Sequence, residues 1–528
     1  MRSHSPPQPY QALLALARSR PRLYRWRVGI LSAIGYGYIA IVGLAFAAAG
    51  SGIFAALLYG VWTRHPALPD GGQEFTAALV LFAAFTVAFW VVAILIARAF
   101  WITLPKPKGV RLRRAVAPQL FALLREVGGS VGVGRLRHVI VTTGFDTYIY
   151  RQPRLGGLLP PADTLVIGLP VLQALSVTQL RVLLLRELAS LACQRRQVGS
   201  PWVSWQGVVW QNLAPVDFLF DGMLRWYRPL FNQHVRVMAR QEADAADAIA
   251  ARQADPTILG HVLLLTEMLK RYHRICYQKL IKQAERQPHP PTDGLCQWRT
   301  DTCTAPPPEV QERWWHELLS ADDDSHPPSL PTRLTQLGSA SVFWQRFQFG
   351  DVTERAADQL LGAYHLQLTQ ELNRLWYMDI APDWAKRYDY IKTVNGIEGK
   401  ILEVPLTVDE IWQLAEWHLN EEDFRHGRQL LEQCLRLEPL HGPANFTLGK
   451  ILLVEGNSQG VPYLEQAMTV DAQWFDPACR LLIEFFAVEG DKAQAQDYAA
   501  RLQQHHRQLE QAQQERNKLH STPLIPCP

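Results

Sequence analysis

Two long apolar runs near the N-terminus constrain this 528-residue chain more than any other feature. Residues 28–63 carry no charge, and residues 75–97 are 23 positions of mainly Leu, Val, Ile, Ala and Phe. As helices rising 1.5 Å per residue the runs would extend about 54 Å and about 35 Å, against a bilayer core of about 30 Å. A first run of this length with a second span behind it is unlike a cleaved secretory signal. The sequence therefore predicts a transmembrane helical hairpin, with spans at about 35–60 and 75–97.

The net charge of +4 is concentrated on the two outer flanks of this hairpin. Each flank holds six basic residues and no acidic one, whereas the loop at 64–74 has one Arg and two acidic residues. The positive-inside rule then predicts that both flanks, and everything after the second span, are cytoplasmic. When these twelve residues are left out, the rest of the chain has 41 of the 53 Lys and Arg against 49 Asp and Glu, a net charge of −8. An acidic chain of this kind argues against nucleic-acid binding. The twelve are Arg2, Arg18, Arg20, Arg22, Arg25, Arg27, Arg98, Lys106, Lys108, Arg111, Arg113 and Arg114.

A further uncharged stretch, residues 197–216, bears on the number of spans. It contains Trp202, Trp205 and Trp210, but its Gln, Asn and Pro residues make it a weak span. Contact with the membrane surface is the favoured interpretation, and more than two spans stays an open alternative.

The middle of the chain predicts a small β-sheet among helices. Residues 138–143 and 164–167 are short β-branched runs with a turn-rich segment, 152–157, between them. Ser176 with Gln179 three positions later forms a capping box, which predicts a helix from there to about Arg195. Further helices are expected at 223–251 and 256–281.

The last third of the chain shows a 34-residue period. Three pairs of helices are expected, at 410–437, 444–470 and 478–505, and a stacked helical period of this length is typical of tetratricopeptide repeats. An irregular helical bundle with accidental spacing is the alternative. The residues that repeat are Leu414, Leu448 and Leu482, and Glu421, Glu455 and Glu489 near the turns, with Pro443 and Pro477 opening two units.

The fold class expected from these patterns is mainly α with a small β-sheet, an N-terminal transmembrane hairpin and C-terminal helical repeats. The predicted segments are a basic N-terminus at 1–27, the hairpin at 28–104, a mixed domain at 105–340, a helical connector at 341–404, the repeats at 405–508 and a tail at 509–528.

A seven-residue run on the predicted Ser176 helix, Leu-Leu-Arg-Glu-Leu-Ala-Ser at 184–190, connects this domain to a known family. With the preceding Ile-Gly-Leu-Pro-Val-Leu-Gln-Ala-Leu-Ser at 167–176, it resembles the HtpX-type membrane gluzincin metallopeptidases, which have an HELGH motif here. Gln-Pro-Arg-Leu-Gly at 152–156, and Ser-His-Pro-Pro at 325–328 with Arg333, are similar to two other segments of that family. The resemblance implies a gluzincin-like peptidase domain at 105–340 and suits a bacterial inner membrane.

The zinc site that the resemblance implies is degenerate. Two His four residues apart and a later Glu would hold Zn²⁺, and the Glu after the first His would be the general base. Here Arg186 and Ser190 stand at the His positions, Glu187 at the base position and Ala243 at the third ligand. Glu242 is a substitute ligand if the alignment slips by one residue; Asp247 and His326 have structural or supporting roles. In the family, the edge strand that receives the substrate carries an Asn-Ala pair. This chain has Phe-Asp-Thr at 145–147 in its place, which also speaks against substrate binding of the family's kind.

These losses favour a protein without a metal. An always-charged Arg at a ligand position repels Zn²⁺ and cannot bind it. Arg186 is instead expected to place its charge where the metal's would be, paired with Glu242, Asp244 or Asp247.

Three functions follow from these observations. The first is a membrane-anchored metallopeptidase-like scaffold or regulator that has lost its zinc site, with no cofactor, and with membrane lipid and proteins or peptides as partners. The second is an active zinc-dependent metalloendopeptidase acting on membrane or misfolded proteins, with Glu187 as base. The third is a repeat-type adaptor unrelated to peptidases.

Overall fold

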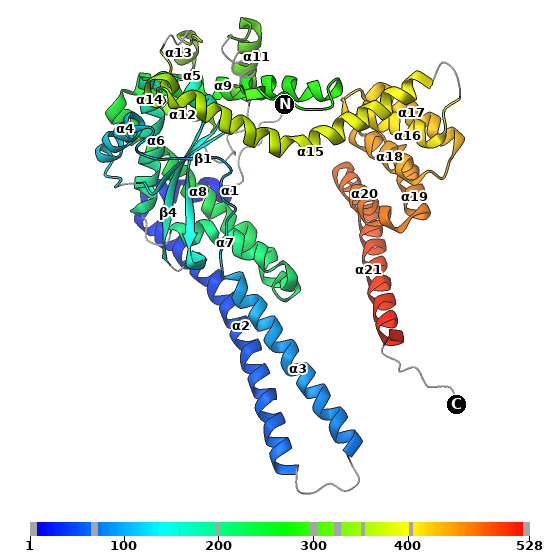
Figure 1. The fold of residues 1–528 in the computed structure, drawn as a ribbon. Helices are drawn as coiled ribbons and strands as arrows, with labels where there is room; N and C mark the ends of the chain where they lie inside the picture. Colours follow the sequence, from blue (N-terminus) through cyan, green and yellow to red (C-terminus); the bar gives the residue numbers. More distant parts are fainter. Residues whose placement is uncertain are drawn as a thin grey trace. The chain divides into compact units, whose positions relative to one another are not determined.

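The protein forms two mainly helical units, seen in Figure 1. A computed structural model describes residues 8–64, 72–134, 136–157, 159–196, 200–295, 305–320, 329–349, 354–400 and 405–520. The first unit comprises Met1–Gln283 and His289–Pro382, and the second comprises Ala284–Pro288 and Asp383–Pro528. The division falls within the segment predicted as a helical connector. A small four-stranded sheet lies in the first unit, in agreement with the predicted mainly α fold class.

The predicted apolar hairpin is formed by two long helices, α2 (Pro21–Arg64) and α3 (Gly72–Ala99), which pack against each other and extend away from the sheet (Figure 1). Both are long and apolar enough to cross a membrane. Helix α2 starts well before the predicted span because the basic flank is helical too. Large apolar side chains are exposed along both helices, which in water would be an unfavourable surface. Among them are Ile41, Leu44, Phe54, Trp62, Val80, Phe82, Val87 and Ile94.

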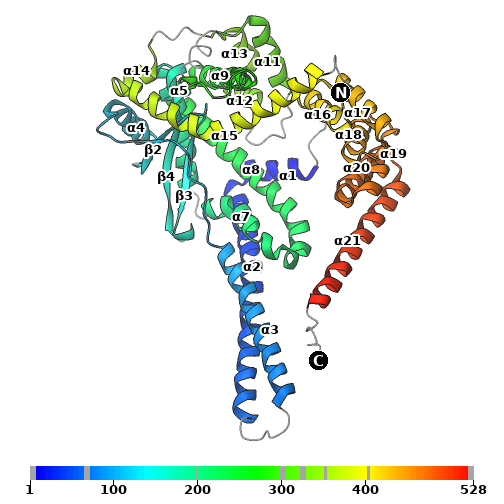
Figure 2. The same ribbon diagram turned by 45° about the vertical axis from the view of Figure 1, so that its right-hand side comes forward.

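The base of the hairpin is packed against α1 (Gln8–Ser19), α7 (Ser200–Asn212) and α8 (Asp221–Ala254), as Figure 2 shows. A chain of buried hydrogen bonds joins α2, α7 and α8. Ser32 Oγ donates to Gln206 Oε1 at 2.9 Å, and Gln206 Nε2 donates to the Tyr227 hydroxyl at 3.2 Å, which donates to the Leu31 carbonyl at 2.6 Å. Two tryptophans of the weak span, Trp205 and Trp210, are buried here and pack among these helices.

The sheet has the strand order β1-β2-β4-β3. The pair β2 and β4 is parallel, and the other two pairs are antiparallel. The strands are β1 (Val110–Leu112), β2 (His138–Thr142), β3 (Thr147–Arg154) and β4 (Leu159–Gly168).

Strand β3 was not predicted, and three residues assigned to a turn, 152–154, belong to it. Pro153 is compatible with a strand here because β3 is at the edge of the sheet and its register with β4 shifts between Gln152 and Arg154. The turn itself is shorter, Leu155–Gly157, with Gly156 in the left-handed region at φ +64°.

Helices cover this sheet with a shared apolar core. The capping box that opens α6 (Val177–Arg195) is present: Ser176 Oγ accepts from the Gln179 amide at 3.2 Å, and Gln179 Oε1 accepts from the Ser176 amide at 2.9 Å. The predicted helices at 223–251 and 256–281 correspond to α8 and α9 (Pro256–Lys282). The core includes Leu120, Leu165, Ile167, Leu172, Leu180, Leu184 and Leu188.

Shorter elements complete the first unit. They are α4 (Pro118–Ser130), α5 (Leu169–Ala174), η2 (Ala214–Leu219), α11 (Pro308–Ser320), α12 (Leu330–Leu337), α13 (Ala340–Gln345) and α14 (Ala356–Leu361). The helix α15 (Tyr364–Lys400) runs from the first unit into the second, and η3 (Gln283–Glu285) lies at their other boundary.

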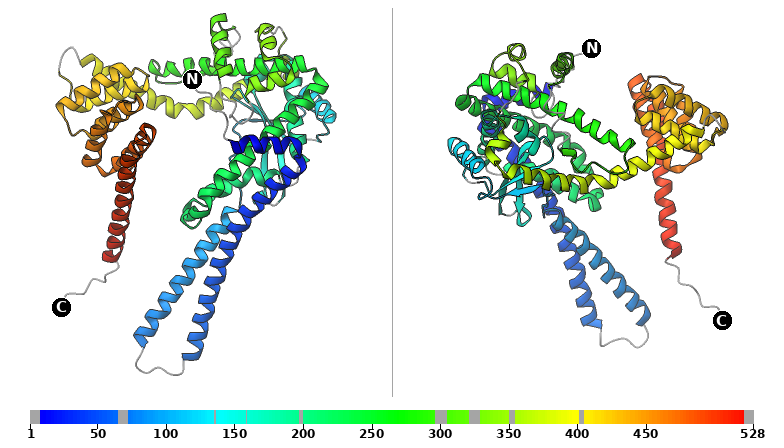
Figure 3. Two further views of the ribbon diagram at one scale, coloured as in Figure 1. Left: turned by 180° about the vertical axis from the view of Figure 1, so that it is seen from behind. Right: turned by 45° about the horizontal axis from the view of Figure 1, so that its top comes forward.

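The second unit contains three successive helix pairs, which follow one another in sequence order in Figure 3. The equivalent Leu414, Leu448 and Leu482 are all buried, in the first helix of each pair. This matches the 34-residue spacing, while their assignment as tetratricopeptide repeats stays a prediction. The elements are α16 (Val408–Asn420), α17 (Phe424–Leu437), α18 (Gly442–Val454), α19 (Gly460–Val470), η4 (Ala472–Trp474), α20 (Phe475–Glu489) and α21 (Lys492–His520).

The close approach of α2 to α7 and α8 predicts that Gly35→Ala is destabilising. A Cβ at Gly35 would lie 2.1 Å from Gln206 Nε2 and 2.6 Å from the Tyr227 hydroxyl oxygen, so the chain of buried hydrogen bonds must shift. Overpacking of this kind costs about 2 kcal/mol, to be measured by chemical unfolding in detergent. The matched control is Gly37→Ala on the same helix, where a Cβ meets nothing within 4 Å. Equal stability of the two variants would contradict the packing described.

The start of α16 predicts a stability contribution that is lost in acid. Hydrogen bonds from Lys400 and from Thr407 lower the pKa of Glu410 to about 2. The unfolded carboxyl titrates near its ordinary value, so the contribution is complete above about pH 4.5 and disappears as the pH falls toward about 2. In Glu410→Gln, hydrogen-exchange protection of the α16 amides should therefore depend less on pH in this window. Glu484→Gln, at an exposed position on α20, is the control that should behave as the unmodified protein.

Candidate functional site

The degenerate motif lies on α6, whose apolar residues anchor it in the core. Leu184 and Leu188 are fully buried, so the helix is fixed in rotation and directs Arg186, Glu187 and Ser190 along its less apolar face. This helix packs against α8, which carries Glu242, Ala243 and Asp247. The structure thus brings together two segments that the sequence separates by about 60 residues.

Arg186 forms a charged network with three other residues. Its Nη1 donates to Glu187 Oε1 at 2.5 Å and its Nε donates to Asp247 Oδ1 at 3.2 Å. Arg333, on α12, donates two hydrogen bonds to the same Asp247, from Nε to Oδ2 at 2.7 Å and from Nη2 to Oδ1 at 2.9 Å. The four side chains are between 5% and 17% exposed. Two guanidinium groups and two carboxylates balance, so the network is electrically neutral.

The protonation of Arg186 follows from these neighbours. Burial works to lower the pKa of Arg186, but the carboxylates of Glu187 and Asp247 outweigh it, and the pKa is raised. The guanidinium therefore remains a fixed positive charge at every pH at which the protein is folded.

Most of the other residues predicted for the site lie outside this charged network. Of the three carboxylates considered as partners of Arg186, Asp247 is the one that pairs with it. Glu242 is buried, and it lies near Cys193, about two turns beyond Arg186 on α6. Burial raises the pKa of the Cys193 thiol, and the charge of Glu242 raises it further. Ala243 is buried and offers no polar side-chain atom. His326 lies outside the described residues, and the second contact of Asp247, with Arg333, was not foreseen.

The residues present do not fit a three-ligand zinc site. Arg186 and Ala243 supply no ligand atom, and Ser190 supplies only a hydroxyl, which is not a ligand that Zn²⁺ sites use. A dication held between Glu187 and Asp247 would also face the guanidinium of Arg186. At about 4 Å and an effective dielectric constant of 20, that repulsion is about 8 kcal/mol.

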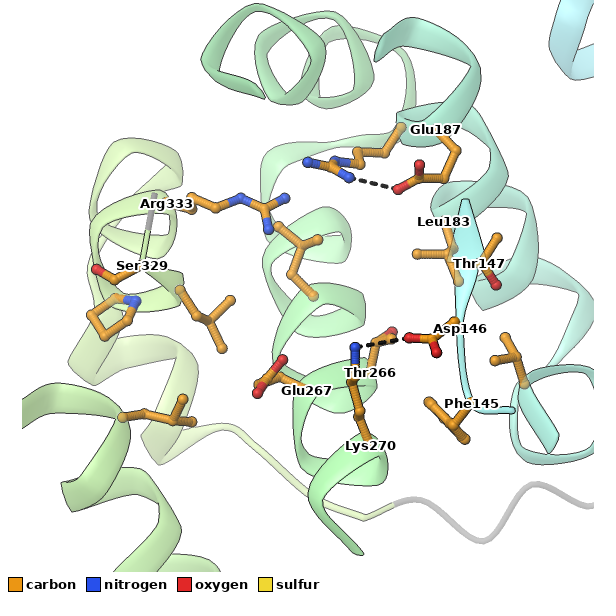
Figure 4. Close-up of a pocket in the computed structure, with 16 residues that line it drawn as sticks. Phe145, Asp146, Thr147, Leu183, Glu187, Thr266, Glu267, Lys270, Ser329 and Arg333 are labelled. Atoms are coloured by element: carbon orange, nitrogen blue, oxygen red, sulfur yellow. Dashed lines mark hydrogen bonds and ion pairs between the residues drawn. The ribbon is translucent and has the colours of Figure 1, made fainter. Parts of the chain in front are cut away.

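A cleft of about 410 Å³ opens beside this network (Figure 4). One side is formed by Arg186 and Glu187 with the start of the edge strand β3, and the other by α9 and the beginning of α12. Asp146 and Lys270 form an ion pair across the cleft at 2.8 Å, and the guanidinium of Arg333 lies at its edge. The site therefore keeps a concave surface with alternating charges next to a strand edge.

A second group of potential metal ligands lies in the second unit. His418, Asp423 and His426 have ligand atoms within 4.8 Å of one another, and no other such trio occurs in the described part of the chain. Hydrogen bonds from His426 lower the pKa of Asp423, whose carboxylate also caps α17. The two imidazoles and the carboxylate could together hold a divalent transition metal. Sequence reasoning missed this trio, although its His-x4-Asp-x2-His spacing was a visible signal.

Comparison with known proteins does not assign the chain to a family. No model of a known protein family matches the chain, and no curated protein matches it. The likeness to HtpX-type metallopeptidases is carried by the short segments quoted above and stays a prediction.

The geometry predicts that Asp247→Asn is strongly destabilising. The substitution leaves two largely buried guanidinium groups with one carboxylate fewer, which costs about 3 kcal/mol or more in free energy of unfolding. Asp146→Asn is the matched control, because it breaks the more exposed pair with Lys270 and should cost less than about 1 kcal/mol. Similar losses in both variants would show that Asp247 does not hold α6, α8 and α12 together.

Proposed function

We propose that this protein is a membrane-anchored, metallopeptidase-like scaffold or regulator that binds polypeptides without cleaving them. The proposal combines three features: a charge network in place of a zinc site, a cleft beside a strand edge, and an array of helix pairs. The first two lie in the first unit and share Arg186, Glu187 and Arg333, and the third lies in the second unit.

The observation that carries the proposal is the position of Arg186. In zinc enzymes a ligand His commonly donates its second ring nitrogen to a carboxylate that orients it. Here the residue at the first His position of the resemblance donates to a buried carboxylate, Asp247, in the same manner, but it is an arginine. The supporting carboxylate is retained while the metal ligand is replaced by a permanent cation. This arrangement preserves the packing of α6 on α8 without a metal.

The two apolar helices support the membrane anchor. We place both basic flanks, and with them the cleft and the helix pairs, on the cytoplasmic side of a bacterial inner membrane, because the positive-inside rule orients such a hairpin. Membrane lipid is then an obligatory partner.

The helix pairs of the second unit support protein binding. Gly449 follows the equivalent Leu448 as in the Leu-Gly pair of the tetratricopeptide pattern, and a Cβ there would come within 2.9 Å of the Gly460 carbonyl. Such close pairing of successive helices builds an extended surface suited to peptide segments. We propose that this surface recruits the protein or peptide partners.

Metal analysis of the full-length protein tests the proposal. Protein purified in detergent, equilibrated with Zn²⁺ and dialysed should retain no zinc attributable to Glu187, Glu242 or Asp247, and should not cleave an unfolded substrate. The double substitution of His418→Ala and His426→Ala identifies any zinc that is held by the His418, Asp423 and His426 trio of the second unit. The triple variant R186H/S190H/A243E restores the ligand types of the resemblance and should gain about one zinc per chain.

Two results would contradict the proposal. One is stoichiometric zinc that survives the His418 and His426 substitutions but is lost on replacing Glu242 or Asp247. The other is proteolysis that is abolished by Glu187→Ala. Either would favour an active zinc endopeptidase instead.

A further inference from the structure

A groove of about 810 Å³ lies where the apolar helix α2 meets its basic flank. It is lined by the first turns of α2, the start of α7, Met238 of α8 and Arg196, the residue directly after α6. This is the level at which α2 changes from an arginine-rich to an uncharged sequence. A helix that enters a bilayer makes this change at the headgroup region.

One end of the groove is strongly basic. Arg22, Arg25 and Arg196 line it, and its lining contains no acidic residue. All three side chains are exposed, and within the described residues none of them forms an ion pair. In the described part of the chain, Arg25 donates a hydrogen bond to the Pro21 carbonyl, at 3.2 Å. Guanidinium groups with no carboxylate among them have the charge and the hydrogen-bond donors that bind a phosphate group.

The rest of the groove is apolar and aromatic. Trp26, Tyr36 and Trp202 line it, and Trp26 is 73% exposed. The floor includes Gly29, where a Cβ would meet nothing within 4 Å, so the surface is open for an apolar chain. The exposed Ile30 and Ile34 continue this surface along α2.

The walls of the groove are held in place from behind. The Tyr36 hydroxyl donates to the Trp202 carbonyl at 2.8 Å, and the two rings pack edge to face at 5.6 Å. Ser32, which also lines the groove, is fixed by its hydrogen bond to the fully buried Gln206. This part of the groove is therefore formed in advance, and its side chains lose little conformational entropy when it is occupied.

We propose that this groove binds one phospholipid with an anionic headgroup. The phosphate lies among Arg22, Arg25 and Arg196, and an acyl chain lies along Trp26, Gly29 and Ile30. A soluble phosphate compound would use the basic end alone, whereas a phospholipid uses both the charged and the apolar part of the groove. The inference rests on the proposed membrane anchor and is independent of the zinc question.

Lipid binding to the full-length protein in a neutral detergent tests this inference, because a micelle has no anionic surface of its own. Native mass spectrometry with added phosphatidylglycerol or phosphatidylcholine should show one phosphatidylglycerol retained per chain in preference to phosphatidylcholine. The double variant R25Q/R196Q should bind phosphatidylglycerol about 30-fold more weakly, because each arginine near a lipid headgroup contributes about 1 kcal/mol to the free energy of binding. R20Q/R27Q removes the same charge from exposed positions of the same flank that do not line the groove, and should change binding less than about 3-fold.

A second variant pair tests the apolar part without changing charge. Gly29→Trp fills the open floor and should abolish retention of the lipid, whereas Gly37→Trp, also at an open position of α2 but outside the groove, should not. Equal retention of both lipids, equal weakening by R20Q/R27Q, or displacement of phosphatidylglycerol by millimolar inorganic phosphate would overturn the proposal. The last result would indicate a simple anion site.

Discussion

Asp247 is the residue on which the arrangement of the first unit depends. Its carboxylate accepts hydrogen bonds from Arg186 of α6 and Arg333 of α12 while it belongs to α8, so one buried acid joins three helices that are far apart in the sequence. Glu187 balances the remaining positive charge. A buried network of this kind is tolerated only when every charge is paired, and this one is.

Helix α8 connects the two surfaces to which we assign binding. Met238 lines the basic groove at the base of the hairpin, and Asp247 lies nine residues further on, about 14 Å along the helix. The same helix therefore contacts α2 at one end and positions the cleft at the other. If the hairpin crosses the membrane as proposed, the cleft is held at a short, fixed distance from the lipid surface.

Much of the fold was predictable wherever the signal was local. The capping box at Ser176 and the helices that became α8 and α9 follow from short-range spacing, and the apolar hairpin follows from composition alone. Strand β3 was missed because Pro153 and Gly156 are typical of turns, and only the edge position and register shift explain a strand there. The pairing of Arg186 with an acid on α8 was foreseen from the resemblance.

The second hydrogen-bond partner of Asp247, Arg333, was not foreseen. Nothing in the sequence indicates that two residues 86 positions apart are in contact. The groove was missed for another reason: Arg22 and Arg25 were interpreted only as topology signals, and Arg196 lines the same groove because α7, which follows it, packs on α2.

The central claim is that a guanidinium stands where the resemblance implies a metal. Crystals of the full-length protein grown with excess Zn²⁺, measured on both sides of the zinc absorption edge, test it directly. The account predicts no anomalous peak between Glu187 and Asp247, with Arg186 in contact with both carboxylates. A peak at that position, ligated by carboxylates and with Arg186 turned away, would contradict it.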